Sequence, residues 1–508
     1  MMPPQIGVQV PSAKSRGVVA PAPGTATVEQ DGRVGHCRRA PPRDRFGPPG
    51  RIDMVTSNDS GDAASVDLDE VRALLVSYHD NASISRAKVL PARALAGAAS
   101  HGITISNSVG FLFSVDDHLN ETAALDPIVG DLRGIPDLSA VAMLDPAVGL
   151  AWAPADLHTL EGTVHPTCTR SALRRVAADA AAAGLDFLVG FELEFTLFRG
   201  SPDEPELAAQ GPGYSTRATL DVEAWMLDVL AALDTAGVPV AQFHPEFGPG
   251  QYELALAPRE PLRAVDDLAL ARVVILRTAA AHGLLVSFSP VPLVGGATNG
   301  CHVHLSATRD GQALLVDPAT RLGVTWEGGH LIAGILDRLE EGVALLGGSV
   351  LSFVRLSPRT WAGADICWGP ANREAAIRYV TGQTVDVLAH ASQANLEVKP
   401  MDAAANPYLA VAAVLAAAVD GARRNARLPE PVEIDPGRLT DEQRAARGIR
   451  RLPADLAAAL ELLDGSAFFR EVFGDVLLDA YLAVRRHEAD AYGGRPPQNV
   501  ADAVRWRY

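Results

Sequence analysis

Residues 189–198 read Val-Gly-Phe-Glu-Leu-Glu-Phe-Thr-Leu-Phe. Phenylalanines and leucines at positions 191, 193, 195 and 197 alternate with Glu192, Glu194 and Thr196. A period of two predicts a β-strand with one apolar and one polar face. Glutamate is uncommon in strands, and two like charges on one face repel each other. The pair therefore requires either a solvated strand or a cation nearby.

The same alternation recurs in three later segments. Their polar sides carry Gln251 and Glu253, then His302, His304 and Ser306, and then Glu397 and Lys399. We expect the four strands to form one sheet whose polar face lines a cleft, because each strand has an apolar face to bury. Carboxylate oxygens with one or two imidazoles suit Mg²⁺ or Mn²⁺ better than zinc. The pattern therefore favours a site for a metal-bound nucleotide.

The composition argues against several classes of protein. The chain has 508 residues and a formal net charge of -17, which is unfavourable for binding nucleic acid or an anionic membrane. Its four cysteines form no C-x-x-C pair, so we expect no disulfide framework, no structural zinc site and a cytoplasmic location. The most apolar run, residues 407–419, is too short to cross a bilayer. The only lysines, at positions 14, 88 and 399, do not follow a glycine, which excludes a Walker A nucleotide site.

Composition and periodicity divide the chain into three parts. Residues 1–64 are rich in Pro, Gly, Ala and Arg and are predicted to be a disordered tail, within which Met54 is a candidate alternative start. Residues 65–162 are predicted to form a small α+β domain that begins with a helix over Leu68–Ser77. Residues 163–508 are predicted to form a large α/β domain. Its predicted helices span residues 171–183, 221–236, 264–282, 326–346, 407–424, 456–463 and 467–492.

Five motifs, in this order, resemble those of the glutamine synthetase superfamily, and the resemblance covers roughly Val66 to Tyr508. They are Gly190–Phe195, His244–Glu253, Asn299–Ser306, Asn372–Arg378, and Glu397-Val-Lys399 followed by Asn406-Pro-Tyr408. The resemblance implies an α+β fold, in which an N-terminal β-grasp domain precedes a catalytic domain with a curved antiparallel sheet lining the active site. It also implies a homo-oligomeric ring, a hexamer or dodecamer, with active sites between neighbouring subunits.

The resemblance implies a role for each site residue. One metal ion would be held by Glu194, Glu246 and Glu253 near the substrate carboxylate, and another by Glu192, His302 and Glu397 on the ATP phosphates. The amino-acid substrate would be bound by Arg355, Gly300 and Lys399, the nucleotide by His304, Ser306 and Arg378, and the transferring phosphoryl group by Arg373 and Arg378. Asp80 would be lent by the small domain to the amine pocket of a neighbouring subunit.

These roles are physically coherent as a set. Phosphoryl transfer depends on positioning and on neutralisation of charge, which two metal ions and planar guanidinium groups supply. Taken singly, each of Arg355, Arg373 and Arg378 would more commonly form an ordinary ion pair at an interface or on the surface. Asp80 alone, next to Asn81, is also a common turn residue.

The chain departs from the family pattern around the amine site. In glutamine synthetases a loop after the substrate arginine carries a glutamate that takes a proton from ammonium, whereas counting from Arg355 places Trp361 there. Tryptophan offers an aromatic wall that suits an alkyl or aryl amine, or holds a cationic amine by a cation–π contact. Ala297 stands where asparagine is usual, and Lys399 stands where arginine is usual. These changes resemble the γ-glutamyl-amine ligases, which use polyamines, ethanolamine, alkylamines or anilines.

We therefore predict an ATP-dependent ligase that joins the γ-carboxylate of glutamate to an organic amine through a γ-glutamyl phosphate, with Mg²⁺ or Mn²⁺ as cofactor. The predicted catalytic residues are Arg373, Arg378, Asp80 and Trp361. Three alternatives stay open: an ordinary glutamine synthetase using ammonium, a non-catalytic structural or regulatory relative, and an enzyme for another amino acid or a hydroxy acid. The presence of all six predicted metal ligands argues against the non-catalytic alternative.

Overall fold

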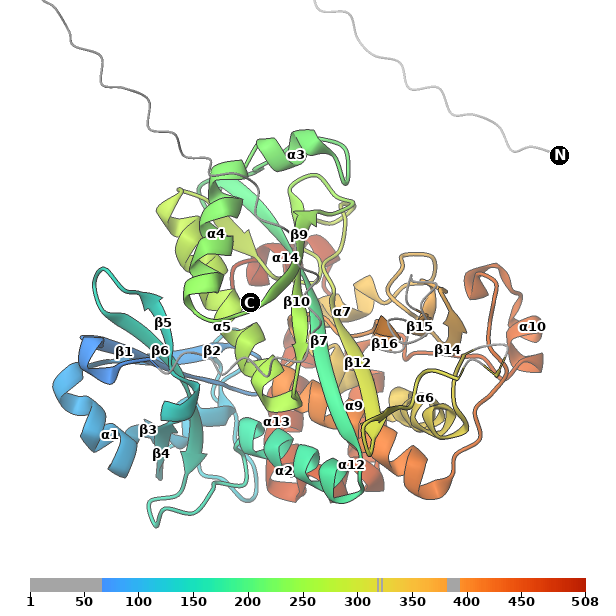
Figure 1. Ribbon diagram of the computed structural model, residues 1–508, viewed down its shortest axis with the longest axis horizontal. Coiled ribbons are helices and arrows are strands. Elements are labelled where there is room, and N and C mark those ends of the chain that lie inside the picture. Colours follow the sequence, from blue (N-terminus) through green and yellow to red (C-terminus); the bar gives the residue numbers. More distant parts are fainter. Residues whose placement is uncertain (1–65, 318, 321–322, 382–392) are drawn as a thin grey trace, which may run out of the picture. The chain divides into compact units, whose positions relative to one another are not determined.

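The computed structural model describes residues 66–317, 319–320, 323–381 and 393–508. The predicted tail, residues 1–64, lies outside these ranges. In the described residues, helices and strands are mixed along the chain, which confirms the expected α+β class (Figure 1).

The N-terminal part of the described chain forms a mixed sheet. Its strands are β1 (Ala73–His79), β2 (Ser85–Pro91), β3 (Ile103–Ser106), β4 (Asp131–Pro136), β5 (Ala142–Asp145) and β6 (Leu150–His158). Their order is β2-β1-β6-β4-β3, with β5 also paired to β6. Strand β1 runs parallel to β6 and antiparallel to β2, and helix α1 (Leu95–His101) packs against β4. A mixed sheet with a packed helix agrees with the predicted β-grasp domain.

The prediction of a helix over Leu68–Ser77 was wrong. Apart from a short 3₁₀ turn at Leu68–Glu70, this segment leads into strand β1. Leucine, alanine and arginine favour helix locally, but Leu74 and Val76 are fully buried between neighbouring strands. Pairing with β2 and β6 therefore outweighs the local helix propensity.

The larger sheet contains all four strands whose alternation marked the site. The neighbouring strands β16 (Asn395–Val398), β12 (Cys301–Arg309), β7 (Asp186–Gly200) and β10 (Gln251–Arg259) lie side by side, which confirms the expectation of one sheet (Figure 1). The remaining strands are β8 (Pro205–Leu207), β9 (Val240–Pro245), β11 (Leu285–Ser287), β13 (Gln312–Ala313), β14 (Asp365–Pro370), β15 (Ala375–Val380) and β17 (Arg450–Arg451). In the described chain every pairing of this sheet is antiparallel except β14 with β15.

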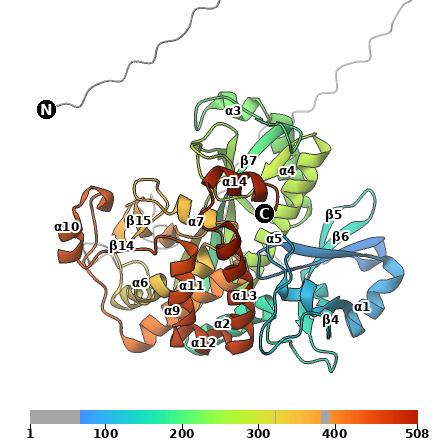
Figure 2. The ribbon, with the colours of Figure 1, turned by 180° about the vertical axis from the view of Figure 1, so that it is seen from behind.

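Helices pack around the strands of this sheet and against one another. They are α2 (Thr169–Ala182), α3 (Thr216–Leu220), α4 (Glu223–Thr235), α5 (Pro261–Ala281), α6 (Trp326–Leu346), α7 (Val350–Arg355), α9 (Pro407–Arg424), α10 (Asp441–Ala446), α11 (Leu456–Asp464), α12 (Ala467–Phe473), α13 (Asp475–Tyr492) and α14 (Pro497–Val504). From behind, α9, α11 and α13 are seen in front of the sheet (Figure 2). The single helix predicted over residues 467–492 is divided at Gly474, whose φ of 78° lies in the left-handed region. None of the described helices is both long and apolar enough to span a membrane.

The apolar face of β7 anchors the core. Phe191, Leu193, Phe195 and Leu197 are buried, and β7 and β10 pack against α5. Burial of one face forces the alternate side chains, including Glu192 and Glu194, to the opposite face of the sheet. The hydrophobic core therefore fixes the direction of the site residues.

A buried ion-pair cluster joins the smaller sheet to the helices. Arg170, at the start of α2, donates to Asp266 of α5 at 2.9 and 2.7 Å. The same guanidinium donates to Asp156 of β6 at 2.9 Å and to Asp137 at 2.8 Å. One arginine thus ties together segments from both parts of the described chain.

Candidate active site

The strand register brings the predicted ligands together. Strand β7 lies between β10 and β12, with Glu253 opposite Glu194 and His302 opposite Glu192. On the far side of β12, Glu397 of β16 lies opposite His304. Because these residues share a face of adjacent strands, their side chains converge.

They line a cavity of about 430 Å³. Ten of the predicted site residues contribute to its wall: Glu192, Glu194, Glu246, Glu253, His302, Arg355, Trp361, Arg373, Glu397 and Lys399. Loop residues 296–298 and 359–362, together with Phe247 and Gln251, complete the wall.

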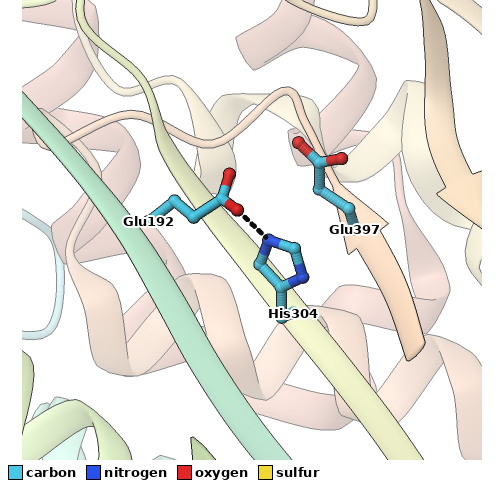
Figure 3. A group of neighbouring side chains, drawn as sticks. All are labelled: Glu192, His304 and Glu397. Atoms are coloured by element: carbon cyan, nitrogen blue, oxygen red, sulfur yellow. Dashed lines mark ion pairs between the residues drawn. The ribbon is translucent and has the colours of Figure 1, made fainter. Parts of the chain in front are cut away.

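One acidic group in the site contains Glu192, His304 and Glu397 (Figure 3). A ligand atom from each lies within 4.8 Å of the other two. His304 Nε2 is 3.2 Å from Glu192, while its Nδ1 is 2.8 Å from the side-chain oxygen of Asn395. His304, predicted to contact the nucleotide, is therefore placed equally well to share in holding a cation.

His302 lies at the centre of the carboxylates. Its Nδ1 is 3.4 Å from Glu192 and 3.3 Å from Glu397, and its Nε2 is 3.9 Å from Glu194. The ring is 6% exposed, so these carboxylates are its principal polar surroundings. The structure thus brings Glu192, His302 and Glu397 together as the resemblance implied.

A second group contains His244, Glu246 and Glu253. His244 Nε2 is 3.2 Å from Glu253, and Tyr214 donates a hydrogen bond of 2.5 Å to Glu246. Glu194 lines the same cavity. Gln251 orients its carboxylate by donating to it at 3.3 Å, and the same amide donates to the carbonyl of Thr298 at 2.9 Å. Glu194, Glu246 and Glu253 therefore face one part of the cavity.

The carboxylates of this second group have raised pKa values, as expected for acidic groups crowded together without a cation. Burial, and then repulsion from Glu194, raises the pKa of Glu246 above its usual value. Burial also raises the pKa of Glu253, with further contributions from Glu192 and Glu194. A divalent cation among these oxygens would offset both the desolvation and the repulsion. The donor set, rich in carboxylates with few imidazoles, fits Mg²⁺ or Mn²⁺.

Glu397 is held ionised by cations of the protein itself. Burial acts to raise its pKa, but Lys399, His302 and His304 together lower the pKa to about 2. Glu192, as the acceptor for His304 Nε2, has the converse effect on the imidazole: burial lowers the pKa of His304, but the carboxylate outweighs burial and raises the pKa to about 9.

Arg355 is fixed at the floor of the cavity. It is 2% exposed, and its Nη2 donates to the Lys399 carbonyl at 3.0 Å and lies 3.2 Å from His302 Nε2. The Gly300 backbone N–H donates to Glu194 at 2.6 Å, and a Cβ there would lie 2.5 Å from His302 and 2.7 Å from Arg355. Only glycine fits between these groups.

Other predicted residues occupy neighbouring positions. Arg373 places its guanidinium carbon 5.7 Å from the centre of the Trp361 ring, a cation–π contact at the cavity wall. Arg378 donates to Glu397 at 2.8 Å. Ser306 lies on β12 opposite Leu188, two residues beyond His304. Ala297 packs against Gly248. A Cβ added at Gly248 would lie 2.4 Å from the Cβ of Ala297, so the two loops are in close contact.

Asp80 is not brought into this site. Its side chain has no exposed surface, and its carboxylate accepts hydrogen bonds from Arg86 Nε and the Ile84 N–H, both at 2.8 Å. Asp80 therefore does not line the cavity of its own chain. Its role in the amine pocket of a neighbouring subunit stays a prediction.

The sequence analysis gave no role to three polar residues in or beside the site. His244 had a readable signal, since it stands two residues before Glu246 in the second motif. Tyr214 follows a Gly-Pro-Gly turn with no periodic pattern, and Glu374 lies in the turn between β14 and β15. Loop conformation places both side chains, and no spacing rule predicts it.

Comparison with known proteins gives concordant matches. The model of the glutamine synthetase catalytic domain matches residues 166–502. The γ-glutamylpolyamine synthetase GlnA3 of Streptomyces coelicolor is 42% identical over 465 residues, covering 91% of this chain and 98% of that protein. A glutamine synthetase of Methanosarcina mazei is 29% identical over 428 residues, covering 83% of this chain and 92% of that protein.

Solved structures give the same picture. The crystal structure of a novel glutamine synthase homologue superimposes with a TM-score of 0.76 at 31% identity, covering 86% of this chain and 99% of the other. A GmaS–ADP complex superimposes with a TM-score of 0.73 at 26% identity, covering 84% and 95%.

Proposed function

The chain belongs to the glutamine synthetase family, and we propose that it is an ATP-dependent ligase that joins the γ-carboxylate of glutamate to an organic amine. The observation that carries the choice of an amine is the position of Trp361. This side chain is half exposed on the cavity wall, in the loop where glutamine synthetases carry the glutamate that serves ammonium.

We propose that two sets of residues hold divalent cations. One set is Glu194, Glu246 and Glu253, and the other is Glu192, Glu397 and His302, with His304 as a further candidate. Bound Mg²⁺ or Mn²⁺ would neutralise phosphate charge during transfer. Tyr214 and Gln251 support this reading, because they orient the carboxylates of Glu246 and Glu194.

The remaining residues would bind and orient the reactants. Arg355, buried and fixed, offers its guanidinium to the carboxylate of glutamate, and Arg373 and Arg378 offer theirs to the phosphoryl group. The γ-phosphate would pass to the side-chain carboxylate of glutamate, giving an acyl phosphate. An amine would then displace phosphate and form the amide.

We propose a polyamine as the amine. The 42% identical relative is named as a γ-glutamylpolyamine synthetase. The cavity walls agree with a cationic chain, because five glutamates line them together with the exposed rings of Trp361 and Phe247. Carboxylates attract ammonium groups, and aromatic faces hold them by cation–π contacts.

A phosphate-release assay tests the proposal. Purified protein is given Mg²⁺, ATP and glutamate with putrescine, spermidine, ethanolamine, methylamine, aniline or ammonium, and the products are identified by mass spectrometry. We expect turnover with polyamines and a γ-glutamyl amide as product. Turnover on ammonium with every organic amine silent would establish an ordinary glutamine synthetase. A folded protein silent with every amine and every acid tested would favour a non-catalytic relative.

Two controls sharpen this assay. Glu194→Ala removes a proposed metal ligand without changing the apolar face of β7, so it should fold normally and lose turnover. Replacing glutamate by aspartate or 2-hydroxyglutarate tests the identity of the acid, which Lys399 and Ala297 leave open.

We further propose a homo-oligomeric ring in the cytoplasm, with boundaries at residues 65–162 and 163–508. The match of the catalytic-domain model from residue 166 supports the second boundary. Native mass spectrometry of the full chain would distinguish a hexamer or dodecamer from a monomer.

A further inference from the structure

Glu374 braces the loop that carries Trp361. It lies between β14 and β15 and is 8% exposed, although it bears a charge. Its Oε2 accepts the backbone N–H of Arg359 at 3.0 Å, and its Oε1 accepts that of Trp361 at 3.0 Å. Both carboxylate oxygens are therefore used to hold the main chain of one short loop.

That loop has a conformation that it would not adopt unaided. Arg359 has a φ of 65° and Trp361 a φ of 60°, both in the left-handed region that ordinary side chains avoid. The Thr360 hydroxyl between them donates to the carbonyls of Ser357 at 2.6 Å and Arg355 at 3.1 Å. Two strained positions so close together persist only where the surroundings fix them, and the Glu374 carboxylate accepts the charge-assisted hydrogen bonds that do so.

Glu374 is itself held in place by hydrogen bonds through Asn372. The Glu374 N–H donates to the side-chain oxygen of Asn372 at 3.1 Å. The Asn372 amide in turn donates to the carbonyls of Val432 at 2.7 Å and Ile434 at 3.1 Å. The loop is thus tied through two side chains to a segment far away in the sequence.

The brace also sets the cation–π pair on the cavity wall. Glu374 directly follows Arg373, and it holds the backbone of Trp361, so it fixes both partners of the contact at 5.7 Å. We propose that Glu374 is a positioning residue for amine selection: it holds residues 356–363 so that the Trp361 ring and Arg373 form the wall against which the amine lies. This role rests on the proposed function.

The first test measures the loop itself and requires no turnover. Arg359 is exposed, and trypsin cleaves after arginine, so cleavage between Arg359 and Thr360 reports loop opening. We expect Glu374→Ala to be cleaved there about tenfold faster than the wild type, because two bonds to a charged acceptor are lost. Asp435→Asn is the matched control: it removes a carboxylate 3.9 Å from the Arg359 side chain but leaves both backbone bonds, so its cleavage should match the wild type.

The second test measures selection. Glu374→Ala should raise the KM for the preferred amine about tenfold and leave the KM for glutamate within about twofold, because Arg355 keeps its own buried contacts. Any displacement of Arg373, the proposed phosphoryl ligand, should appear in kcat. Glu374→Gln, which keeps one acceptor oxygen, should fall between. In a Trp361→Ala background, Glu374→Ala should change the amine KM little, because both substitutions remove the same wall.

The outcomes separate the two proposals. Unchanged cleavage at Arg359 in Glu374→Ala would refute the brace, and faster cleavage with an unchanged amine KM would refute its role in selection. A wild-type protein that uses only ammonium would refute the proposed function, while the cleavage result would still decide whether Glu374 holds the loop.

Discussion

Lys399 Nζ lies 2.8 Å from Glu397 Oε1, and both side chains are buried. Arg378 donates to the other oxygen of the same carboxylate, also at 2.8 Å. Glu397 therefore has a protein cation on each oxygen, and His302 stands 3.3 Å away. The sequence analysis assigned Lys399 to the amino-acid substrate, whereas the structure directs its ammonium group to a proposed metal ligand.

Lys399→Met should destabilise the fold strongly. Removing one partner of a buried pair leaves a charge without compensation, and such losses cost about 3–5 kcal/mol. The remaining bond from Arg378 places the expected loss near the lower end, about 3 kcal/mol in the free energy of unfolding. Denaturant titration at neutral pH measures it.

Lys88→Met is the matched control, because Lys88 is exposed and donates only to the Thr104 carbonyl. A loss below about 0.5 kcal/mol is expected there. Equal losses in the two variants would show that the buried pair with Glu397 contributes nothing specific.

Gly300→Ala should lower turnover about a hundredfold while the chain still folds. The added methyl group would lie 2.5 Å from His302 and 2.7 Å from Arg355, so both side chains must move. Overpacking of this kind costs about 1–3 kcal/mol of stability, and displacement of site groups by about 1 Å lowers the rate about a hundredfold. Steady-state kinetics and a thermal melt measure the two effects.

Gly97→Ala in helix α1 controls for the substitution, since nothing lies within 4 Å of the added atom. We expect it to keep full activity and to gain slightly in stability. Normal turnover by Gly300→Ala would instead mean that the His302–Arg355 contact is not needed for the reaction.

The fold was predictable where side-chain periodicity is local. Alternation along residues 189–198 identified β7, and the same rule found β10, β12 and β16 of the same sheet. The helices α6 and α9 have the predicted bounds, because glycine or charged residues end their apolar patterns. Leu68–Ser77 failed because its partners β2 and β6 lie elsewhere in the chain, and pairing between distant strands is not encoded in local propensity.

The candidate site was predictable to the extent that motifs carry its residues. The strand residues Glu192, Glu194 and His302 lie at the cavity because period and register follow from the sequence. The positions of Glu374 and Tyr214 depend on loops with left-handed or turn conformations, and residue spacing does not predict such conformations. Asp80 pairs with Arg86 of its own chain, and its role toward a neighbouring subunit stays a prediction.

The pH dependence of stability should contain a contribution from Asp267 in α5. Burial raises its pKa to about 6, although Arg263 at 2.9 Å and Arg259 at 3.4 Å oppose the shift. A folded-state pKa above the unfolded value of 3.8 means that the folded chain binds the proton more tightly. Its stabilising contribution is therefore complete below pH 3.8 and is lost as the pH rises through about 6. The shift corresponds to about 3 kcal/mol.

Asp267→Asn removes this dependence. Between pH 5 and pH 8 the variant should have a higher free energy of unfolding than the wild type, by at most about 3 kcal/mol. The ion pairs with the two partly exposed arginines are lost, which reduces this gain. Urea titrations of both proteins at pH 5 and pH 8 measure the difference. A stability difference that is the same at both pH values would contradict the raised pKa of Asp267.

Trp361→Glu should shift the enzyme from organic amines toward ammonium. The substitution places a carboxylate on the cavity wall, where it can accept a proton from ammonium, and removes the ring that packs against Arg373. Because the backbone bond to Glu374 does not depend on the side chain, the loop should keep its conformation. The new carboxylate lies close to Glu374, and the Arg373 guanidinium offsets part of that repulsion. We expect measurable glutamine formation and at least a tenfold higher KM for the amine.

Trp326→Glu, at an exposed tryptophan that does not line the cavity, is the matched control and should leave both activities unchanged. A folded Trp361→Glu variant with wild-type amine kinetics and no glutamine formation would mean that the aromatic wall does not decide the nitrogen donor.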